Sequence, residues 1–117
     1  MRFSFTKADR LLKRINFLSL ASHGRQLHNK NFVAVFAPGK FERKRLGITV
    51  SKRVGNAVVR NRVKRFTREY FRLNRQKITG NWDINIIAKK ESANLSSSQA
   101  FLSLQNIFDK INRSLYH

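Results

Sequence analysis

The sequence predicts an α/β (α+β) two-layer sandwich, in which a small sheet packs with helices. Apolar residues recur at helical spacing in three separate segments, and between those segments they alternate with other residues in shorter runs. The order along the chain is helix, strands, long helix, strand, helix. This order favours helices that pack on one small sheet.

The first predicted element is a short helix near the N-terminus. His23-Gly24 is a plausible stop, so we expect this helix to end near Ser22. Its apolar positions, which recur at helical spacing, are Leu11, Leu12, Ile15 and Leu18.

Two strands are predicted next. Residues 32–36 form a compact apolar run that Pro38-Gly39 closes, and apolar residues alternate with small or polar ones over residues 46–50. The basic loop of residues 40–44 joins these strands.

A long, basic helix is predicted to follow them. With each residue placed about 100° around the axis from the last, one narrow arc is apolar and the opposite arc is basic. The apolar arc holds Val59, Val63, Phe66, Tyr70 and Leu73; the basic arc holds Arg60, Lys64, Arg65, Arg68 and Arg72, with Asn61 among them and Arg62 at its rim. Guanidinium groups clamp phosphate bidentately and stack on exposed bases, so this arc suits a nucleic acid.

The last two predicted elements are a strand and an amphipathic helix. Apolar residues alternate over residues 82–88, behind the turn residues Gly80-Asn81. Ser96 followed by Gln99 is the pattern of a capping box at a helix start. The apolar stripe that follows at helical spacing holds Phe101, Leu104, Phe108, Ile111 and Leu115.

Composition limits the function classes. The 117 residues, 41% of them hydrophobic, suffice for one core, so we expect a single domain over residues 1–117. Without cysteine there is no disulfide, thiolate nucleophile or Cys-ligated zinc, and the three histidines, His23, His28 and His117, are too scattered to suggest a metal site. No apolar run is long enough to span a membrane and the N-terminus lacks the pattern of a secretory signal, so we expect a cytoplasmic protein.

Charge is the most unusual property of the chain. Twenty-five Lys and Arg against six Asp and Glu leave a net charge of +19. Residues 40–77 contain fourteen of these bases and only two acids, which indicates one charged working face. A solvated helix surface is the alternative, but such surfaces mix both signs, and Glu69 is the only acid of the long helix. Composition therefore indicates a polyanion partner; among RNA, DNA and an anionic membrane, the membrane is the weakest candidate.

The segment Ser51-Lys52-Arg53-Val54-Gly55 through Arg60-Asn61-Arg62 resembles the bacterial ribonuclease P protein family, whose signature is an Arg-Asn-Arg helix after such a segment. The resemblance extends to the strand before it and to Phe17, and it covers nearly the whole chain. It implies a four-stranded mixed sheet, three helices and a left-handed crossover through the long helix. The general rule for such crossovers would have favoured the right-handed sense.

This resemblance also implies the function. The chain would be the protein subunit of the ribonucleoprotein that removes the 5′ leader from precursor tRNA. The RNA subunit would be the catalyst and would hold the required Mg²⁺, so the protein itself would have no catalytic residue, metal or cofactor. The expected partners are the RNase P RNA subunit and precursor tRNA, with no membrane and no DNA. A basic ribosomal or other structured-RNA-binding protein is the alternative, and a protein-only nuclease is a weaker one because carboxylates are scarce.

The resemblance implies two binding surfaces. The expected RNA-subunit surface holds Arg60, Asn61, Arg62, Lys64, Arg65 and Arg68, and the expected leader surface holds Phe17, Lys52 and Arg53. The leader would bind in a cleft between the first helix and the sheet, by backbone contacts and by stacking of bases on aromatic rings. Where many family members have further aromatics, this chain has Ala21 and Val35, which reduces the stacking expected. Phe32 alternates with apolar neighbours and is expected in the core.

Overall fold

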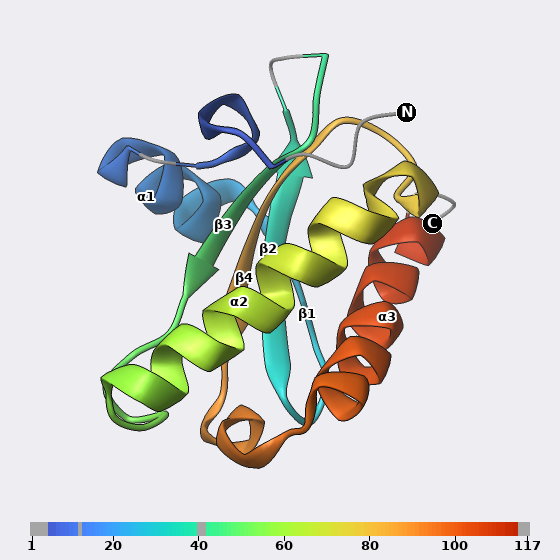
Figure 1. The fold of residues 1–117 in the computed structure, drawn as a ribbon. Helices are drawn as coiled ribbons and strands as arrows, with labels where there is room; N and C mark the ends of the chain where they lie inside the picture. The colour runs from blue at the N-terminus through green and yellow to red at the C-terminus, as the bar shows by residue number, and fades with distance from the viewer. Residues whose placement is uncertain (1–4, 12, 40–41, 115–117) are drawn as a thin grey trace.

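The computed structural model describes residues 5–11, 13–39 and 42–114. The predicted helices and strands are confirmed, with one further strand and three short 3-10 turns (Figure 1). Leu12, Lys40, Leu115 and His117 lie outside the described residues. The elements are η1 (Lys7–Asp9), α1 (Arg14–His23), β1 (Arg25–His28), β2 (Phe32–Pro38), β3 (Arg45–Thr49), α2 (Ala57–Asn74), η2 (Arg75–Lys77), β4 (Trp82–Ala88), η3 (Lys90–Asn94) and α3 (Ser97–Ser114).

The four strands form one mixed sheet in the order β1-β2-β4-β3. β2 pairs antiparallel with β1 and β4, whereas β3 pairs parallel with β4, with Leu46 opposite Ile84. The connection between the two parallel strands is α2. In Figure 1, α2 lies in front of the sheet, both strands run downward and β4 lies to the right of β3, which is the left-handed sense that the resemblance implied.

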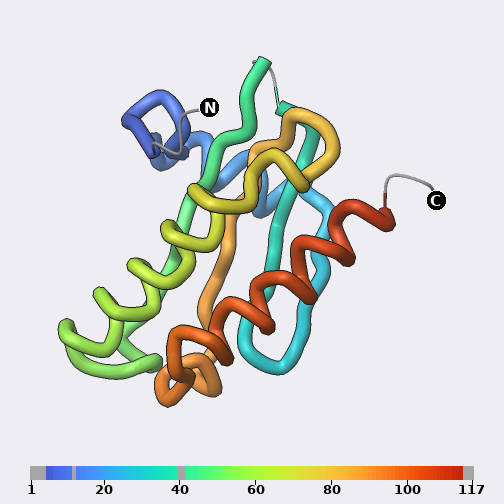
Figure 2. Tube along the Cα trace, turned by 45° about the vertical axis from the view of Figure 1, so that its right-hand side comes forward, coloured from blue at the N-terminus to red at the C-terminus, as the bar shows by residue number. Residues whose placement is uncertain are grey.

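The main core lies between the sheet and the helices α2 and α3, which run side by side on one face (Figures 1 and 2). Alternate residues of β2 and β4 supply the sheet's part, among them Phe36 and Ile84, both fully buried. Tyr70 of α2 stacks on Phe108 of α3 at a ring-centroid distance of 5.5 Å. These two layers form the predicted sandwich.

The buried stripe of α2 differs from the predicted one. Val63 and Tyr70 are buried as expected, but Thr67 and Phe71 complete the stripe, whereas Leu73 is 42% exposed. Thr67 is tolerated in the core because its hydroxyl donates to the carbonyl oxygen of Val63 at 2.9 Å.

α1 packs on the opposite face of the sheet from α2 and α3, where Leu11, Leu20 and Val35 form a small second cluster. The apolar stripe predicted for this helix was wrong, because Ile15 and Leu18 are 70% and 54% exposed. Leu20 and Phe17 face the sheet instead. α1 therefore covers part of a face that would otherwise be open.

β1 is the strand that sequence patterns missed. It has four residues, of which only Leu27 is apolar and half-buried, so no alternation marks it. Contacts with α3 hold it in place: Arg25 donates to the carbonyl oxygen of Ser114 at 3.1 Å, and Lys110 donates to that of His28 at 3.0 Å. The strand thus combines local pairing with β2 and contacts with residues more than 80 positions away.

Asp9 ties the N-terminal segment to the rest of the fold. Its carboxylate accepts from the backbone and hydroxyl of Thr6, and its Oδ1 lies 3.1 Å from Arg75 and 3.3 Å from Arg43. Burial by itself raises the pKa of Asp9, but the hydrogen bonds from Thr6 and Arg75, together with the charge of Arg75, outweigh it and hold the pKa below the usual 3.8. The ionised form is therefore the one that stabilises the fold.

Replacing Asp9 with Asn is expected to destabilise the protein by about 1–3 kcal/mol at neutral pH, because Thr6, Arg43 and Arg75 lose a charged, buried acceptor. Since the folded pKa is lowered, the contribution is complete above about pH 4 and is lost as the pH falls through the folded value. Urea unfolding of both proteins at neutral and acidic pH checks this, with Glu91→Gln as the exposed control. A stability difference that is as large in acid as at neutral pH would contradict the assignment.

Candidate nucleic-acid interface

α2 begins where the sequence supplies a helix cap. The side chain of Asn56 accepts a hydrogen bond from the backbone N–H of Val59 at 3.0 Å, which satisfies one of the free donors of the first turn. From there the 18 residues of α2 extend about 27 Å along the sheet. Buried Val54 anchors the turn before the helix.

The side chains of the predicted basic arc of α2 point in three directions. Asn61 and Arg65 are exposed and, at helical spacing, lie opposite the buried stripe. Lys64 and Arg68, with Arg60 one turn earlier, lie on the flank toward β3. Arg62 lies on the other flank and donates to the carbonyl oxygen of Ala93 at 2.7 Å. Arg62 therefore also has a structural role, in holding η3 against the helix.

Glu69 does not interrupt the positive surface of α2. Its carboxylate accepts from Arg72 at 2.7 Å, one turn along the helix. This hydrogen bond, more than the further attraction of Arg65 and Arg68, holds the pKa of Glu69 below its ordinary value. The acid is thus ionised and paired at neutral pH, and the surrounding cations outnumber it.

Phe17 lies across β3 at Gly47. A Cβ atom added to Gly47 would stand 2.5 Å from Cε1 and 2.8 Å from Cζ of the Phe17 ring, closer than any van der Waals contact. The ring therefore needs a glycine beneath it. Phe17 is half-buried, so part of it remains accessible to a ligand.

Phe17 and the cations of α2 share one hollow of about 200 Å³ at the edge of the sheet, here named the edge hollow. The expected RNA-subunit surface, through Lys64 and Arg68, therefore meets the expected leader surface, through Phe17, at the edge strand β3. The residues that line it are Phe5, Arg10, Leu11, Phe17, Leu46, Gly47, Ile48, Lys64 and Arg68.

Lys52 and Arg53 lie apart from this hollow. Both are exposed in the turn after β3, and an extended chain from Gly47 to Lys52 spans about 16 Å. On the sheet face along this stretch, Thr49 donates to Asn85 at 3.1 Å. Sequence reasoning missed this polar pair, although the alternation of polar and apolar residues in β3 was a usable signal.

The other residues considered for the leader cleft are either buried in the core or exposed. Phe32 is 1% exposed, which confirms its place in the core, and Val35 is buried beneath α1. Ala21 is exposed. His23 and His28 are exposed, and the ring of His23 lies 3.3 Å from the carbonyl oxygen of Ser19.

Gly47→Ala is expected to displace the Phe17 ring, because the new methyl group would occupy its position. The ring is the movable end of a side chain, so the fold should survive. If Phe17 contacts the ligand, affinity for that ligand falls while the melting temperature changes little. Gly39→Ala, in the connection between β2 and β3 and away from Phe17, is the control for the Gly-to-Ala change itself. Unchanged ligand affinity in Gly47→Ala would show that Phe17 does not make the contact.

Metal and membrane sites have little support in the part of the chain that the structure describes. No three His, Cys, Asp or Glu side chains come together there as a metal would require. Nor is any of the described helices both long and apolar enough to cross a bilayer.

The fold and this site define a class of protein: small, basic α+β domains in which a left-handed crossover helix presents cations beside a half-buried aromatic ring. A family model described as Ribonuclease P matches residues 5–112. The ribonuclease P protein component of Desulforapulum autotrophicum is 52% identical, over 96% of each chain, and that of Desulfosudis oleivorans is 49% identical, over 95% of this chain and 92% of its own.

Solved structures agree with this match. The RNase P protein of Staphylococcus aureus superposes with a TM-score of 0.84 at 34% identity, covering 89% of this chain and 95% of that chain. That of Thermotoga maritima superposes with a TM-score of 0.81 at 33% identity, covering 87% and 96%. The chain belongs to the ribonuclease P protein component family. Membership assigns it to tRNA processing, as the protein part of a ribonucleoprotein.

Proposed function

We propose that this protein binds the RNase P RNA subunit and the 5′ leader of precursor tRNA, and that it contributes binding rather than chemistry to leader removal. The observation that carries the proposal is the edge hollow, where a half-buried aromatic ring adjoins the cations of α2. Phosphate contacts and base stacking are the two interactions that single-stranded RNA offers.

The outer side of α2 is proposed as the surface for the RNA subunit. The exposed side chains of Asn61 and Arg65 project from a rigid helix, and the neighbouring cations continue the positive surface along it. Arginine–phosphate contacts of this kind fix orientation rather than read sequence. The proposed set is Arg60, Asn61, Arg62, Lys64, Arg65 and Arg68.

The leader is proposed to run along the sheet face from Phe17 toward Lys52 and Arg53. A base would stack on the accessible part of the Phe17 ring, and the two basic side chains would contact phosphates further along. Since Val35 is buried and Ala21 offers no ring, phosphate contacts carry more of the leader affinity. Lys64 and Arg68 border Phe17, so they are also within reach of the leader.

The chemistry of cleavage is proposed to belong to the RNA subunit, which would hold the Mg²⁺ that activates the attacking water. The side chains of the protein support this division, because three of its six acids are already engaged with arginines. The pairs are Asp9 with Arg43 and Arg75, Asp83 with Arg45, and Glu69 with Arg72. We also propose a cytoplasmic location, because bacterial precursor tRNA is made in the cytoplasm.

Reconstitution tests the proposed function. The protein is added to a bacterial RNase P RNA and 5′-labelled precursor tRNA at low Mg²⁺. We expect accurate leader removal with both components and little with either alone. Tight RNA binding without any stimulation of cleavage would favour a structured-RNA-binding protein with no part in cleavage. Cleavage by the protein without RNA would overturn the division of tasks.

A further inference from the structure

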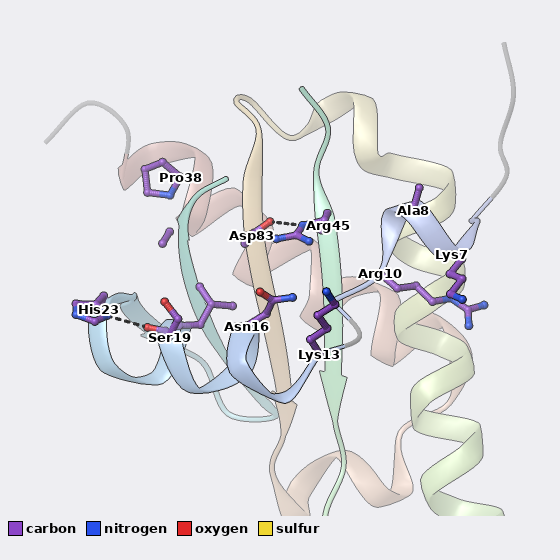
Figure 3. A pocket seen from close by; sticks show the side chains of 12 residues that line it. Lys7, Ala8, Arg10, Lys13, Asn16, Ser19, His23, Pro38, Arg45 and Asp83 are labelled. Carbon is purple, nitrogen blue, oxygen red and sulfur yellow. Dashed lines mark hydrogen bonds and ion pairs between the residues drawn. The ribbon is translucent and has the colours of Figure 1, made fainter. Parts of the chain in front are cut away.

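A second basic hollow lies beside α1 (Figure 3). It has a volume of about 500 Å³ and is here named the N-terminal hollow. The residues that line it come from η1, from α1 and the segment between them, from the last residues of β2 and from the first residues of β3 and β4. Neither Phe17 nor any cation of α2 lines it.

α1 separates this hollow from the proposed leader site. Arg45 and Gly47 lie on the same face of β3, two residues apart, and Gly47 is covered by Phe17 whereas Arg45 lines the N-terminal hollow. From α1 itself, Asn16 and Ser19 line the N-terminal hollow. The sheet face therefore has two sites, one on each side of the helix.

The N-terminal hollow is positively charged. Four basic side chains line it, against the single carboxylate of Asp83. That carboxylate is covered by Arg45, whose Nε and Nη2 donate to it at 2.9 and 2.8 Å. This leaves Lys7, Arg10 and Lys13, which are exposed and form no ion pair with an acid of the described residues.

Polar groups accompany these cations. In Figure 3, Lys13 and Asn16 point from the start of α1 toward the Arg45–Asp83 pair. Ser19 adds a hydroxyl on the next turn, and Ala37 and Pro38 supply an apolar wall. Cations for phosphate, with an amide and a hydroxyl for hydrogen bonds, are the groups that contact a nucleotide.

Arg10 connects the two hollows, since it lines both. Its guanidinium carbon lies 5.2 Å from the centroid of the Phe5 ring. A strand bound at the edge hollow would reach the N-terminal hollow by passing Arg10, around the start of α1. The distance along β3 from Gly47 to Arg45 is about 7 Å.

We propose that the N-terminal hollow binds single-stranded RNA, with Lys7, Arg10 and Lys13 on its phosphodiester groups. This inference rests on the proposed function and adds a site to it. The volume is that of a small-ligand pocket, which admits a nucleotide but not a duplex. The strand is either a continuation of the leader or a single-stranded segment of the RNA subunit, and the chemistry recognised is the same.

The test compares Lys7→Gln/Lys13→Gln with Lys30→Gln/Lys77→Gln. Both variants lose two exposed lysines, but the second pair lies in the β1–β2 turn and in η2. Each protein is assembled with RNase P RNA, and its affinity is measured for precursor tRNAs of increasing leader length over a range of salt. Affinity for the RNA subunit and for a single-stranded oligoribonucleotide, with protein alone, is measured in parallel.

If the leader supplies the strand, the wild-type holoenzyme gains affinity with leader length. The Lys7/Lys13 variant then loses the part of this gain that comes from the longer leaders, because its site at Phe17 is unchanged. Its salt slope falls by roughly 0.7 for each lost contact. If the RNA subunit supplies the strand, assembly weakens equally at all leader lengths. Variants that match their control in every assay overturn the inference. The proposed function still holds in that case if the wild-type protein stimulates cleavage. If the wild-type protein does not stimulate cleavage, its binding to the oligoribonucleotide still tests the N-terminal hollow.

Discussion

Replacing Arg60, Arg65 and Arg68 together with Ala is expected to lower the salt dependence of assembly with RNase P RNA by roughly two to three units of slope. Each arginine that neutralises a phosphate releases counterions on binding, and each loss removes nearly one unit. The three side chains lie outside the buried stripe of α2, so the fold should persist. Affinity measured over a range of salt gives the slope directly.

The control is a triple variant with the same change of charge elsewhere. Lys30, Lys77 and Arg113 are exposed and lie in a turn, in η2 and in α3. If long-range attraction by the net charge of +19 were sufficient, both triple variants would lose equal affinity. Equal slopes in the two variants would show that α2 is not the surface for the RNA subunit.

Phe17→Ala is expected to weaken binding of precursor tRNA by about 1–3 kcal/mol, because a stacked base loses its aromatic partner. Mature tRNA, which has no leader, should bind as before. The measurement is the affinity of the reconstituted holoenzyme for both substrates. Phe17→Tyr, which keeps the ring, should retain most of the wild-type affinity.

Phe17 also packs against the small cluster beneath α1, so loss of packing must be separated from loss of stacking. Phe17→Leu serves this purpose because it keeps an apolar side chain over Gly47 without an aromatic face. If Phe17→Leu binds precursor tRNA as tightly as wild type, stacking is not the contribution. Equal losses for precursor and mature tRNA would assign Phe17 to the core.

The helices and strands with a regular apolar pattern were predictable. The apolar run of β2, the alternation in β3 and β4 and the stripe of α3 are local properties of the chain, and each matches its element. The capping box of α3 is present, with Ser96 N donating to Gln99 and Gln99 N donating to Ser96 Oγ. β1 has no such pattern, because it is an edge strand that depends on backbone pairing with β2 and on contacts with α3 rather than on buried side chains of its own.

The helical stripes show where periodicity is insufficient. In α1, Ile15 and Leu18 have the predicted spacing but are exposed, because the helix rests on the sheet through Leu20 and Phe17. In α2, Tyr70 faces α3 as predicted, but Thr67 and Phe71 are fully buried in place of Leu73, and Phe71 packs against both Phe108 of α3 and Phe5. Periodicity indicates that a helix has an apolar side, whereas its neighbours decide which residues are covered.

The family, the order of the elements and the concentration of positive charge on the long helix follow from the sequence alone, because they depend on residue types and spacing. Only the tertiary structure placed Phe17 over Gly47, brought Lys64 and Arg68 beside that ring, and turned Arg62 toward Ala93. It also collected Lys7, Arg10, Lys13 and Arg45 around a second hollow. These groupings join residues far apart in the chain, and packing across β3 and beneath α1 creates them.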